Sequence, residues 1–469
     1  MLKARIHFLA GFKSKRMAIK LKYVLFALLV MLQLDLSAAF VKVGTGRMVI
    51  TPELPFYLTG YAARDSMATT KVHDLWAKAI VIEENPSSRI VIVTTDVLGL
   101  TPAVSEAAAE RLKKKYGIAR SQIMFNSSHT HSGPMIWPAL SVIGDYDAET
   151  IKRFTSYTVS LTDKLVAAVD MAMQSLEPMQ LSHGTGNAGF ALNRRYKPGP
   201  DAATGKERSN RSDHDVPVLL ARDAKGVVKA VVFGYACHNT TMTGEHNSVN
   251  GDYAGFAQIE VEKKYPDATA LFVLGCAGDQ NPMPRGTLEY TEQHGKELAA
   301  AVEKVVDGKM ENIGAPLRSA FVRTELPYQP VTVETFQKEL QEGTKYEKRR
   351  AKLIMEARDK GWDLSNHNYP VQAMRIGNKL TILSLSGEVV VDYSLNAKKQ
   401  YPGEHLFVAG YCNQVVCYIP TERIIEEGGY EPVSSQMYYG MPGPFEKSVE
   451  VKVNAAISTV MQKVGLHKK

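Results

Sequence analysis

Short runs of β-branched and other apolar residues recur along the chain, and most of them end in a polar loop that contains glycine. Apolar runs of this length, bounded by turn residues, predict buried β-strands. Reactive-looking residues follow several of these runs, which is the position where α/β proteins collect their ligands. The predicted strands are residues 89–94, 122–125, 227–236, 269–274, 380–385 and 406–409.

Helical patterns lie between these strands. After the first strand, Thr101 is suited to an N-cap, Pro102 to the first helical position and Gly117 to the helix end. Residues 252–265 and the highly charged residues 334–360 also have helical patterns, and the second is expected on the surface. This alternation predicts an α/β fold, with a mixed β-sheet core and helices packed around it.

The N-terminal residues 1–39 are predicted to be a signal peptide. Basic residues come first, then the apolar run 23–34, then small residues that end at Ala39. That order is typical of a secretory signal cleaved after Ala39. A membrane anchor is the alternative, but the run is shorter than the ~20 residues that a spanning helix needs. Met1 and Met17 both remain candidate starts, and a secreted or periplasmic location is expected.

The mature chain, residues 40–469, is long enough for one large domain, with possible lobes at 40–330 and 331–469. The formal charge is +7, but the leader holds seven Lys/Arg and one Asp, so the mature part is near +1. This charge argues against a nucleic-acid partner. No membrane span is predicted in the mature chain, and the oligomeric state cannot be read from the sequence.

The cysteines are too few for a disulfide scaffold and lack the paired spacing of a thiolate zinc site. A bridge between two of them, Cys237 and Cys276, stays open because both sit at predicted strand ends. The four cysteines are Cys237, Cys276, Cys412 and Cys417.

His129 and His131 flank a threonine in the loop after strand 122–125. Alternate residues of an extended segment project to the same side, so the two imidazoles either bind one metal or form a hydrogen-bonded structural pair. His238 follows strand 227–236 and should emerge at the same end of the sheet. Glu388 lies among apolar residues. Burial of a charged carboxylate there costs several kcal/mol of folding free energy unless the carboxylate is paired or binds a cation.

These histidines and the glutamate occur in the order seen in the neutral/alkaline ceramidases, and the chain resembles their catalytic domain over about residues 42–435. The most specific combination is HTHSGP, followed by a histidine at a strand end and a late Gly-Glu. The matching stretches are Gly60-Tyr61, Val72-His73-Asp74, SSHTHSGP, LNRR, ACHNTTM, GCAGDQNP, SLSGE and the segment from Tyr418 to Tyr430.

The resemblance implies one zinc ion per chain, bound by His129, His238, Glu388 and Tyr418. Tyr418 is preferred to Tyr411 because it stands twelve residues before Tyr430, as the family's zinc-binding tyrosine does before its catalytic one. Two imidazoles, a carboxylate and a phenol leave zinc room for a water. Zinc would lower the pKa of that water and so supply the nucleophile.

The resemblance also implies catalytic roles for three other residues. His131 and Tyr430 would hydrogen-bond the oxyanion or the leaving group, and Arg194 would orient the substrate. Donors of this kind contribute ~3–4 kcal/mol each. The alternatives are that Arg194 pairs with Asp213 or Asp215, and that Tyr430 only packs against its neighbours.

Two features depart from the family pattern. Ceramidases carry a catalytic serine where this chain has Gly275, and Cys276 is offset from that position by one residue. The implied reaction therefore relies on metal-activated water. Ceramidases also continue into a β-sandwich domain, whereas this sequence ends at Lys469, which weakens the expectation of lipid-surface binding.

The resemblance therefore implies a zinc-dependent hydrolase that cleaves an amide bond in a ceramide-like N-acyl substrate, with a lipid or small molecule as its partner. One alternative keeps the zinc but acts on a polar amide or a saccharide derivative. The other alternative is a non-catalytic exported binding protein. Four candidate ligands argue for an enzyme, because a binding protein has no physical need for an open-coordinated zinc.

Overall fold

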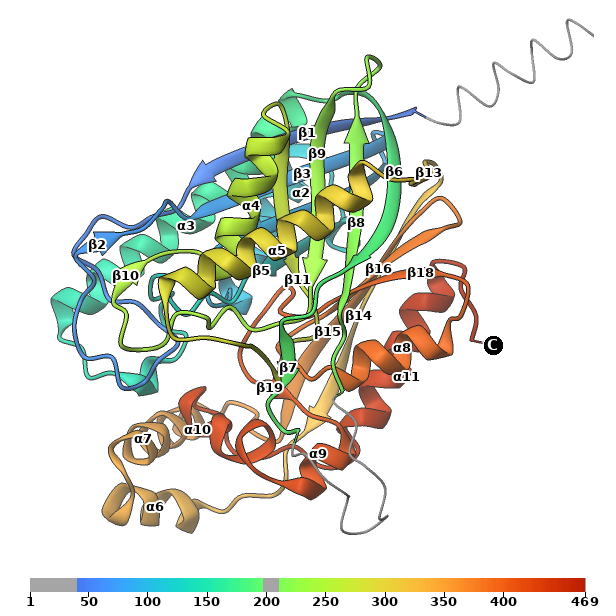
Figure 1. The fold of residues 1–469 in the computed structure, drawn as a ribbon. Helices are drawn as coiled ribbons and strands as arrows, with labels where there is room; N and C mark the ends of the chain where they lie inside the picture. Colours follow the sequence, from blue (N-terminus) through green and yellow to red (C-terminus); the bar gives the residue numbers. More distant parts are fainter. Residues whose placement is uncertain (1–39, 197–210, 469) are drawn as a thin grey trace, which may run out of the picture.

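The computed structural model describes residues 40–196 and 211–468, so the predicted signal peptide lies outside the described residues. Two β-sheets pack face to face, with helices on their outer sides (Figure 1). The architecture is α/β with mixed sheets, which confirms the predicted fold class.

Within the described residues, the larger sheet has nine strands. In spatial order they are β11 (Thr269–Leu274), β9 (Val228–Tyr235), β8 (Asp215–Arg222), β6 (Glu177–Asn187), β1 (Phe40–Val49), β3 (Trp76–Asn85), β4 (Ser88–Thr95) and β5 (Ile123–Ser127), with β13 (Glu311–Ile313) paired to β6. The pairs β9–β11 and β4–β5 are parallel, and the other pairs are antiparallel.

The two outer strands of this sheet, β5 and β11, meet through one side chain. Asn126 on β5 accepts a 2.8 Å hydrogen bond from the Leu274 amide of β11 and donates a 3.3 Å bond to the Leu274 carbonyl. The sheet therefore curls until its two edges touch. This closure brings the carboxyl ends of β5, β9 and β11 together.

The second sheet packs against the curled one. Its strands are β14 (Leu317–Pro327), β15 (Asn366–Ile376), β16 (Leu380–Leu385) and β18 (His405–Ala409). Apolar side chains of both sheets fill the space between them, including Val232 and Leu271 from the first and Met374, Ile382 and Phe407 from the second. Each fully buried side chain of this size stabilises the fold by about 1.5–3 kcal/mol.

Helices cover the outer faces of both sheets. Figure 1 shows α4 and α5 across the strands β8, β9 and β11, and α8 and α11 beside the second sheet. The first of the helices has the predicted caps, because Thr101 accepts from the Val104 amide and Gly117 ends it with a φ of 69°. The bounds are α2 (Pro102–Tyr116), α3 (Ala148–Gln174), α4 (Asp252–Lys264), α5 (Leu288–Val306), α8 (Asp392–Gln400) and α11 (Val449–Lys463).

The charged segment 334–360 forms two helices instead of one continuous pattern. They are α6 (Val333–Glu342) and α7 (Lys345–Asp359). Thr344 and Glu347 form a reciprocal capping box that starts the second helix after Gly343. Because β14 pairs with β15, a boundary after residue 330 would divide one sheet, and the two lobes stay a prediction.

Short elements complete the part of the fold that surrounds the site. They are β2 (Thr70–Lys71), β7 (Ala191–Asn193), β10 (Ser248–Val249), β12 (Gln280–Pro282), β17 (Glu388–Val389), β19 (Tyr418–Ile419), α9 (Glu422–Glu427) and α10 (Ser435–Tyr438). All four cysteines are buried and free, so the open possibility of a Cys237–Cys276 bridge is not realised. In residues 40–196 and 211–468 we find no helix with the length and apolarity that a bilayer crossing requires.

Candidate metal centre and active site

The four side chains predicted as metal ligands lie together. His129 Nε2 is 3.1 Å from Glu388 Oε2, and His238 Nε2 is 3.0 Å from the same oxygen. The Tyr418 hydroxyl is 3.4 Å from His238 Nε2. All four side chains are buried. We call His129, His238, Glu388 and Tyr418 the inner cluster.

Backbone geometry explains why residues so far apart in sequence meet here. His129 follows β5 and His238 follows β9, whose carboxyl ends are brought together by the curl of the sheet. Glu388 and Tyr418 are direct partners in the parallel pair β17–β19. Gly278 allows the loop after β11 to approach this pair closely, since a Cβ there would lie 2.6 Å from the Glu388 carbonyl oxygen.

His129 has a backbone φ of 61°, which few residues other than glycine adopt. Such a conformation costs on the order of 1–3 kcal/mol and persists where the surrounding structure fixes it, often at functional sites. Here the His129 amide donates to the Val97 carbonyl at 3.0 Å. The backbone thus holds the imidazole in its place despite the strain.

The hydrogen bonds of the two imidazoles leave both Nε2 atoms facing the carboxylate as lone pairs. His129 Nδ1 lies 2.6 Å from the Leu98 carbonyl, and His238 Nδ1 lies 2.6 Å from the Ala277 carbonyl. A neutral imidazole has a single N–H, and each carbonyl takes it. Burial lowers the pKa of His238 to about 4, so this ring is neutral at pH 7.

Glu388 is the anionic member of the inner cluster. Burial opposes its ionisation, but His129 and His238, in the form that carries a proton on Nε2, outweigh this and hold the pKa of Glu388 well below its usual value. When the Leu98 and Ala277 carbonyls take the imidazole protons instead, two lone pairs and one carboxylate oxygen face each other at about 3 Å, an arrangement that repels unless a cation lies between them. His129 Nε2 also has no hydrogen-bond partner. The donor set and its geometry fit a divalent metal.

Two further tyrosines contact Glu388. Tyr439 donates a short hydrogen bond to Oε1, and Tyr411 lies 3.3 Å from Oε2. Tyr411 is the alternative to Tyr418 as the tyrosine ligand; its ring lies against that of His129, whereas the ring of Tyr418 lies against that of His238. Tyr439 was missed, because it lies beyond the recognised tyrosine segment and no local pattern marks it.

His131 lines the same centre. Its ring centroid is 4.8 Å from that of His129, and both ring nitrogens lack a hydrogen-bond partner. Burial, followed by the two neighbouring histidines, lowers the pKa of His131 well below its usual value. Gly60 leaves the space for this ring, because a Cβ there would come within 2.6 Å of it. The second histidine of the HxH pair is therefore an unpaired, neutral imidazole beside the inner cluster.

Arg194 and Tyr430 stand on the other side of Tyr418. The Arg194 guanidinium lies 5.4 Å from the Tyr418 ring and 5.2 Å from the Tyr430 ring. Tyr430 is 44% exposed, whereas the four side chains of the inner cluster are buried. Burial of part of the ring, then the charge of Glu388, raise the pKa of Tyr430 to about 12, which keeps the phenol protonated at neutral pH.

The charge partner of Arg194 is Glu431, whose Oε1 accepts from Arg194 Nε at 2.7 Å. The other oxygen of Glu431 accepts from Arg195 at 2.6 Å. The alternative that Arg194 pairs with Asp213 or Asp215 is wrong, because both of those carboxylates bind Lys398. Sequence reasoning missed Glu431, although it directly follows a predicted catalytic tyrosine.

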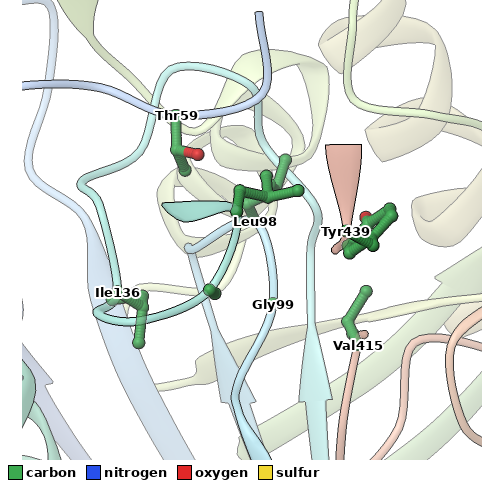
Figure 2. A pocket seen from close by; sticks show the side chains of 8 residues that line it. Thr59, Leu98, Gly99, Ile136, Val415 and Tyr439 are labelled. Atoms are coloured by element: carbon green, nitrogen blue, oxygen red, sulfur yellow. The ribbon is translucent and has the colours of Figure 1, made fainter. Parts of the chain in front are cut away.

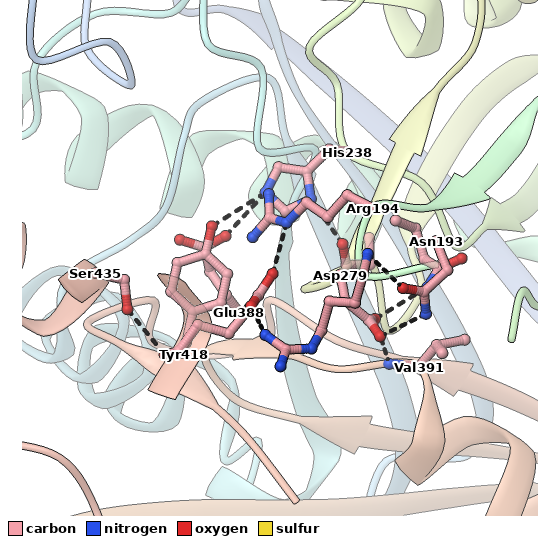
Figure 3. A network of polar contacts seen from close by, with 12 residues as sticks. Asn193, Arg194, His238, Asp279, Glu388, Val391, Tyr418 and Ser435 are labelled. Atoms are coloured by element: carbon pink, nitrogen blue, oxygen red, sulfur yellow. Dashed lines mark hydrogen bonds and ion pairs between the residues drawn. The ribbon is translucent and has the colours of Figure 1, made fainter. Parts of the chain in front are cut away.

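A buried aspartate joins the segments that carry Arg194 and Glu388. Asp279 accepts from the Asn193 side chain at 2.7 Å and from the Val391 amide at 2.9 Å. Figure 3 shows Asp279, Asn193 and Val391 grouped beside Arg194. Burial raises the pKa of Asp279. Its hydrogen bonds therefore fix the relative positions of the arginine and the carboxylate without taking a place in the cluster.

The loop after β11 offers no replacement for the serine of the family. Gly275 continues the strand by donating its amide to the Tyr235 carbonyl at 2.9 Å. Cys276 is fully buried in the hydrophobic core that includes Tyr369 and Leu385, and burial raises the pKa of its thiol. Cys276 is therefore an inert core residue, since the thiolate is the reactive form.

A small apolar pocket adjoins the inner cluster (Figure 2). Tyr439 lines it and also hydrogen-bonds Glu388, while the carbonyl of Leu98, another lining residue, binds His129. Its volume is about 10 Å³, roughly the room that one water molecule needs. The lining residues are Thr59, Leu98, Gly99, Ile136, Ala139, Leu140, Val415 and Tyr439.

The family model described as neutral/alkaline non-lysosomal ceramidase, N-terminal, matches residues 41–315. This region includes His129, His131, Arg194 and His238, whereas Glu388 and the tyrosines lie beyond it. The neutral ceramidase of Pseudomonas aeruginosa is 30% identical over 258 residues, which are 51% of this chain and 37% of that protein. Neutral ceramidase 2 of Arabidopsis thaliana is 24% identical over 247 residues, which are 50% of this chain and 31% of that protein. The matches thus span about a third of these relatives.

Solved structures extend the likeness of the fold to most of the chain. The crystal structure of neutral ceramidase from Pseudomonas aeruginosa superposes with a TM-score of 0.70 at 21% identity, covering 91% of this chain and 75% of that one. A structure described as ceramidase complexed with C2 gives the same TM-score and covers 89% of this chain and 74% of that one. At this identity the comparison establishes the fold.

Proposed function

Because the chain belongs to the neutral/alkaline non-lysosomal ceramidase family, we propose that it is a metal-dependent hydrolase that cleaves the amide bond of an N-acyl substrate. The observation that carries the proposal is the inner cluster, in which two imidazole lone pairs and a carboxylate oxygen face one point. The ceramidase names of the relatives favour a ceramide-like substrate.

Zinc is the metal that best suits this donor set. His129, His238, Glu388 and Tyr418 supply two neutral imidazoles, one carboxylate and one phenol, and catalytic zinc sites have three protein ligands of the first two types. The carbonyls of Leu98 and Ala277 orient the two rings, as partners of metal-bound histidines do. When bound, zinc would lower the pKa of water toward neutrality and polarise the substrate carbonyl.

In this proposal, three side chains around the inner cluster stabilise developing charge, transfer a proton and orient the substrate. Tyr430, protonated at neutral pH, donates a hydrogen bond to the oxygen that gains charge during cleavage. His131, whose ring nitrogens are unpaired, holds or moves a proton at the leaving nitrogen. Arg194, fixed by Glu431 between the two tyrosine rings, orients the substrate.

A polar amide or a saccharide derivative is the second candidate substrate. The pocket beside the inner cluster has room for about one water molecule. Gly275 also lacks a hydroxyl at the position where the resemblance implies a catalytic serine. Export follows from the signal peptide proposed at residues 1–39, so a secreted or periplasmic location belongs to the same proposal.

Hydrolysis assays with a matched substrate panel test the proposal. Purified protein loaded with zinc is compared on N-acyl sphingosine, on water-soluble N-acyl amides and on glycosides. Release of fatty acid from N-acyl sphingosine supports the ceramide-like substrate, and turnover of the soluble amides alone supports the second candidate. Absence of metal together with absence of turnover would contradict the hydrolase and favour the non-catalytic binding protein.

A further inference from the structure

A second group of metal-ligating side chains lies where the two sheets meet. His183 on β6 and Glu311 on β13 are direct cross-strand neighbours in the first sheet, and His405 begins β18 of the second sheet. Each offers one ligand atom, and these atoms all lie within 4.8 Å of one another. We call His183, Glu311 and His405 the outer cluster.

Two of the three ligand separations already match a zinc site. His183 Nε2 is 3.5 Å from Glu311 Oε2, and His405 Nε2 is 3.6 Å from the same oxygen. Ligands that bind zinc tetrahedrally at 2.0–2.2 Å lie ~3.3–3.5 Å apart. A small movement of the exposed His405 ring would complete the set, because its side chain is 51% exposed.

An unsatisfied buried atom points into the outer cluster. The His183 side chain is only 2% exposed, yet its Nε2 has no hydrogen-bond partner. A buried polar atom without a partner is costly, and such atoms in native structures usually mark a function or an absent ion. The His183 and His405 rings also meet edge to face at 4.4 Å, which keeps both beside the carboxylate.

Lys379 does not occupy the position that a metal would take. Its ammonium forms an ion pair with Glu311 Oε1, whereas both imidazoles approach Oε2. One oxygen of the carboxylate can therefore bind a cation while the other keeps the lysine. Lys379 precedes β16, so its ion pair links the same two sheets as the outer cluster does.

We propose that the outer cluster is a second divalent-metal site, with zinc as the best-fitting ion. Two imidazoles and one carboxylate are a donor set that zinc prefers, and the half-exposed sides of Glu311 and His405 leave the fourth position to water. The ion ties β6 and β13 of the first sheet to β18 of the second. Its role is structural, since the outer cluster contacts none of the inner-cluster residues in the described contacts.

Zinc titration of the metal-free, full-length protein tests this site. Calorimetry and elemental analysis should find two zinc ions per chain in the wild type. Glu311→Gln and His405→Ala should each bind one zinc ion fewer than the wild type, because each loses the outer site. Their turnover should be unchanged. Both substitutions are at partly exposed positions, and circular dichroism verifies that the variants fold.

Lys379→Ala is the matched control, because it removes the ion pair of Glu311 and leaves the three ligands in place. It should bind as many zinc ions as the wild type. Equal zinc content in wild type and His405→Ala would overturn the proposal, as would equal loss of zinc in Lys379→Ala and His405→Ala. His129→Ala separates this proposal from the proposed function, since it should lose the inner ion and keep the outer one.

Discussion

The two His/Glu clusters of this protein share their donors but differ in their surroundings. In both, two imidazoles approach one oxygen of a single glutamate. In the inner cluster both Nδ1 atoms are bound by backbone carbonyls at 2.6 Å and all members are buried. In the outer cluster only His183 is buried, and Glu311 keeps a lysine partner.

Under the two proposals, this difference distinguishes a cluster placed for chemistry from one placed for stability. The inner cluster is surrounded by groups that can act on a substrate, namely His131, Tyr430 and Arg194. A strained backbone at His129 and a buried network at Asp279 fix their positions. Among the described residues, the contacts of the outer cluster include no such groups, so the proposed ion there would only join the two sheets.

Removal of an inner ligand should have the largest effect. We expect His129→Ala to lose the inner metal and to lower turnover by at least about 1,000-fold, because several kcal/mol of Lewis-acid stabilisation is lost. Metal content and turnover are measured on the same sample. The matched control is His294→Ala, which removes an equally buried imidazole that bonds to the Pro284 carbonyl and stacks on Phe190, away from the inner cluster. If His129→Ala kept its metal and His294→Ala lost activity equally, the ligand assignment would be wrong.

Tyr430→Phe should have the next largest effect. The variant lacks the phenol that is protonated at neutral pH, so turnover should fall about 100-fold while metal content stays at the wild-type value. Parallel zinc analysis and steady-state kinetics measure both quantities. Unchanged kcat in the variant would mean that Tyr430 only packs against Tyr418 and Arg194.

A smaller loss is expected from Glu431→Gln, which removes the charge that positions Arg194. The ratio kcat/KM should fall about 10-fold, mainly through a higher KM, because Arg194 then orients the substrate less well. Glu427→Gln is the matched control, since Glu427 binds Arg195 and Arg423 but not Arg194. Equal kinetics in the two variants would show that Glu431 acts only as a general structural residue.

Acid should affect the inner cluster through stability. Folding holds the pKa of His238 at about 4, below its ordinary 6.5, so between these values the unfolded chain binds more protons than the folded one. His238 alone should therefore lower the free energy of unfolding of the metal-free protein as pH falls from 6.5 toward 4, by on the order of 1 kcal/mol per pH unit, and His131 and His367, whose pKa values burial also lowers, add to this decrease. Denaturant titrations at several pH values measure it. His238→Gln should reduce the slope by the share of this one ring, whereas an unchanged slope would contradict the neutral state of the buried His238.

Local signals predicted the fold well where they were strong. The runs 269–274 and 380–385 became strands with those bounds, and the caps of α2 formed at Thr101 and Gly117. The break at Gly343 was missed, although the threonine and the glutamate of the capping box were visible in the sequence. Periodicity alone does not show where one charged helix ends and the next begins.

The inner cluster could be predicted because its members occur in a familiar order after recognisable strands. Glu431 and Tyr439 could not, since their roles depend on contacts across the fold with Arg194 and Glu388. The outer cluster was also invisible, because His183 and Glu311 become neighbours only through the register of β6 and β13. Pairing between distant strands carries no local pattern that a sequence reveals.

The most direct test of the central claim is a crystal structure of the zinc-loaded protein with anomalous data at the zinc edge. We expect one anomalous peak within about 2.0–2.2 Å of the Nε2 atoms of His129 and His238 and of a Glu388 oxygen. Zinc-loaded crystals that show no peak at this point, while His129 and His238 keep their positions, would contradict the metal centre from which the proposed hydrolase follows.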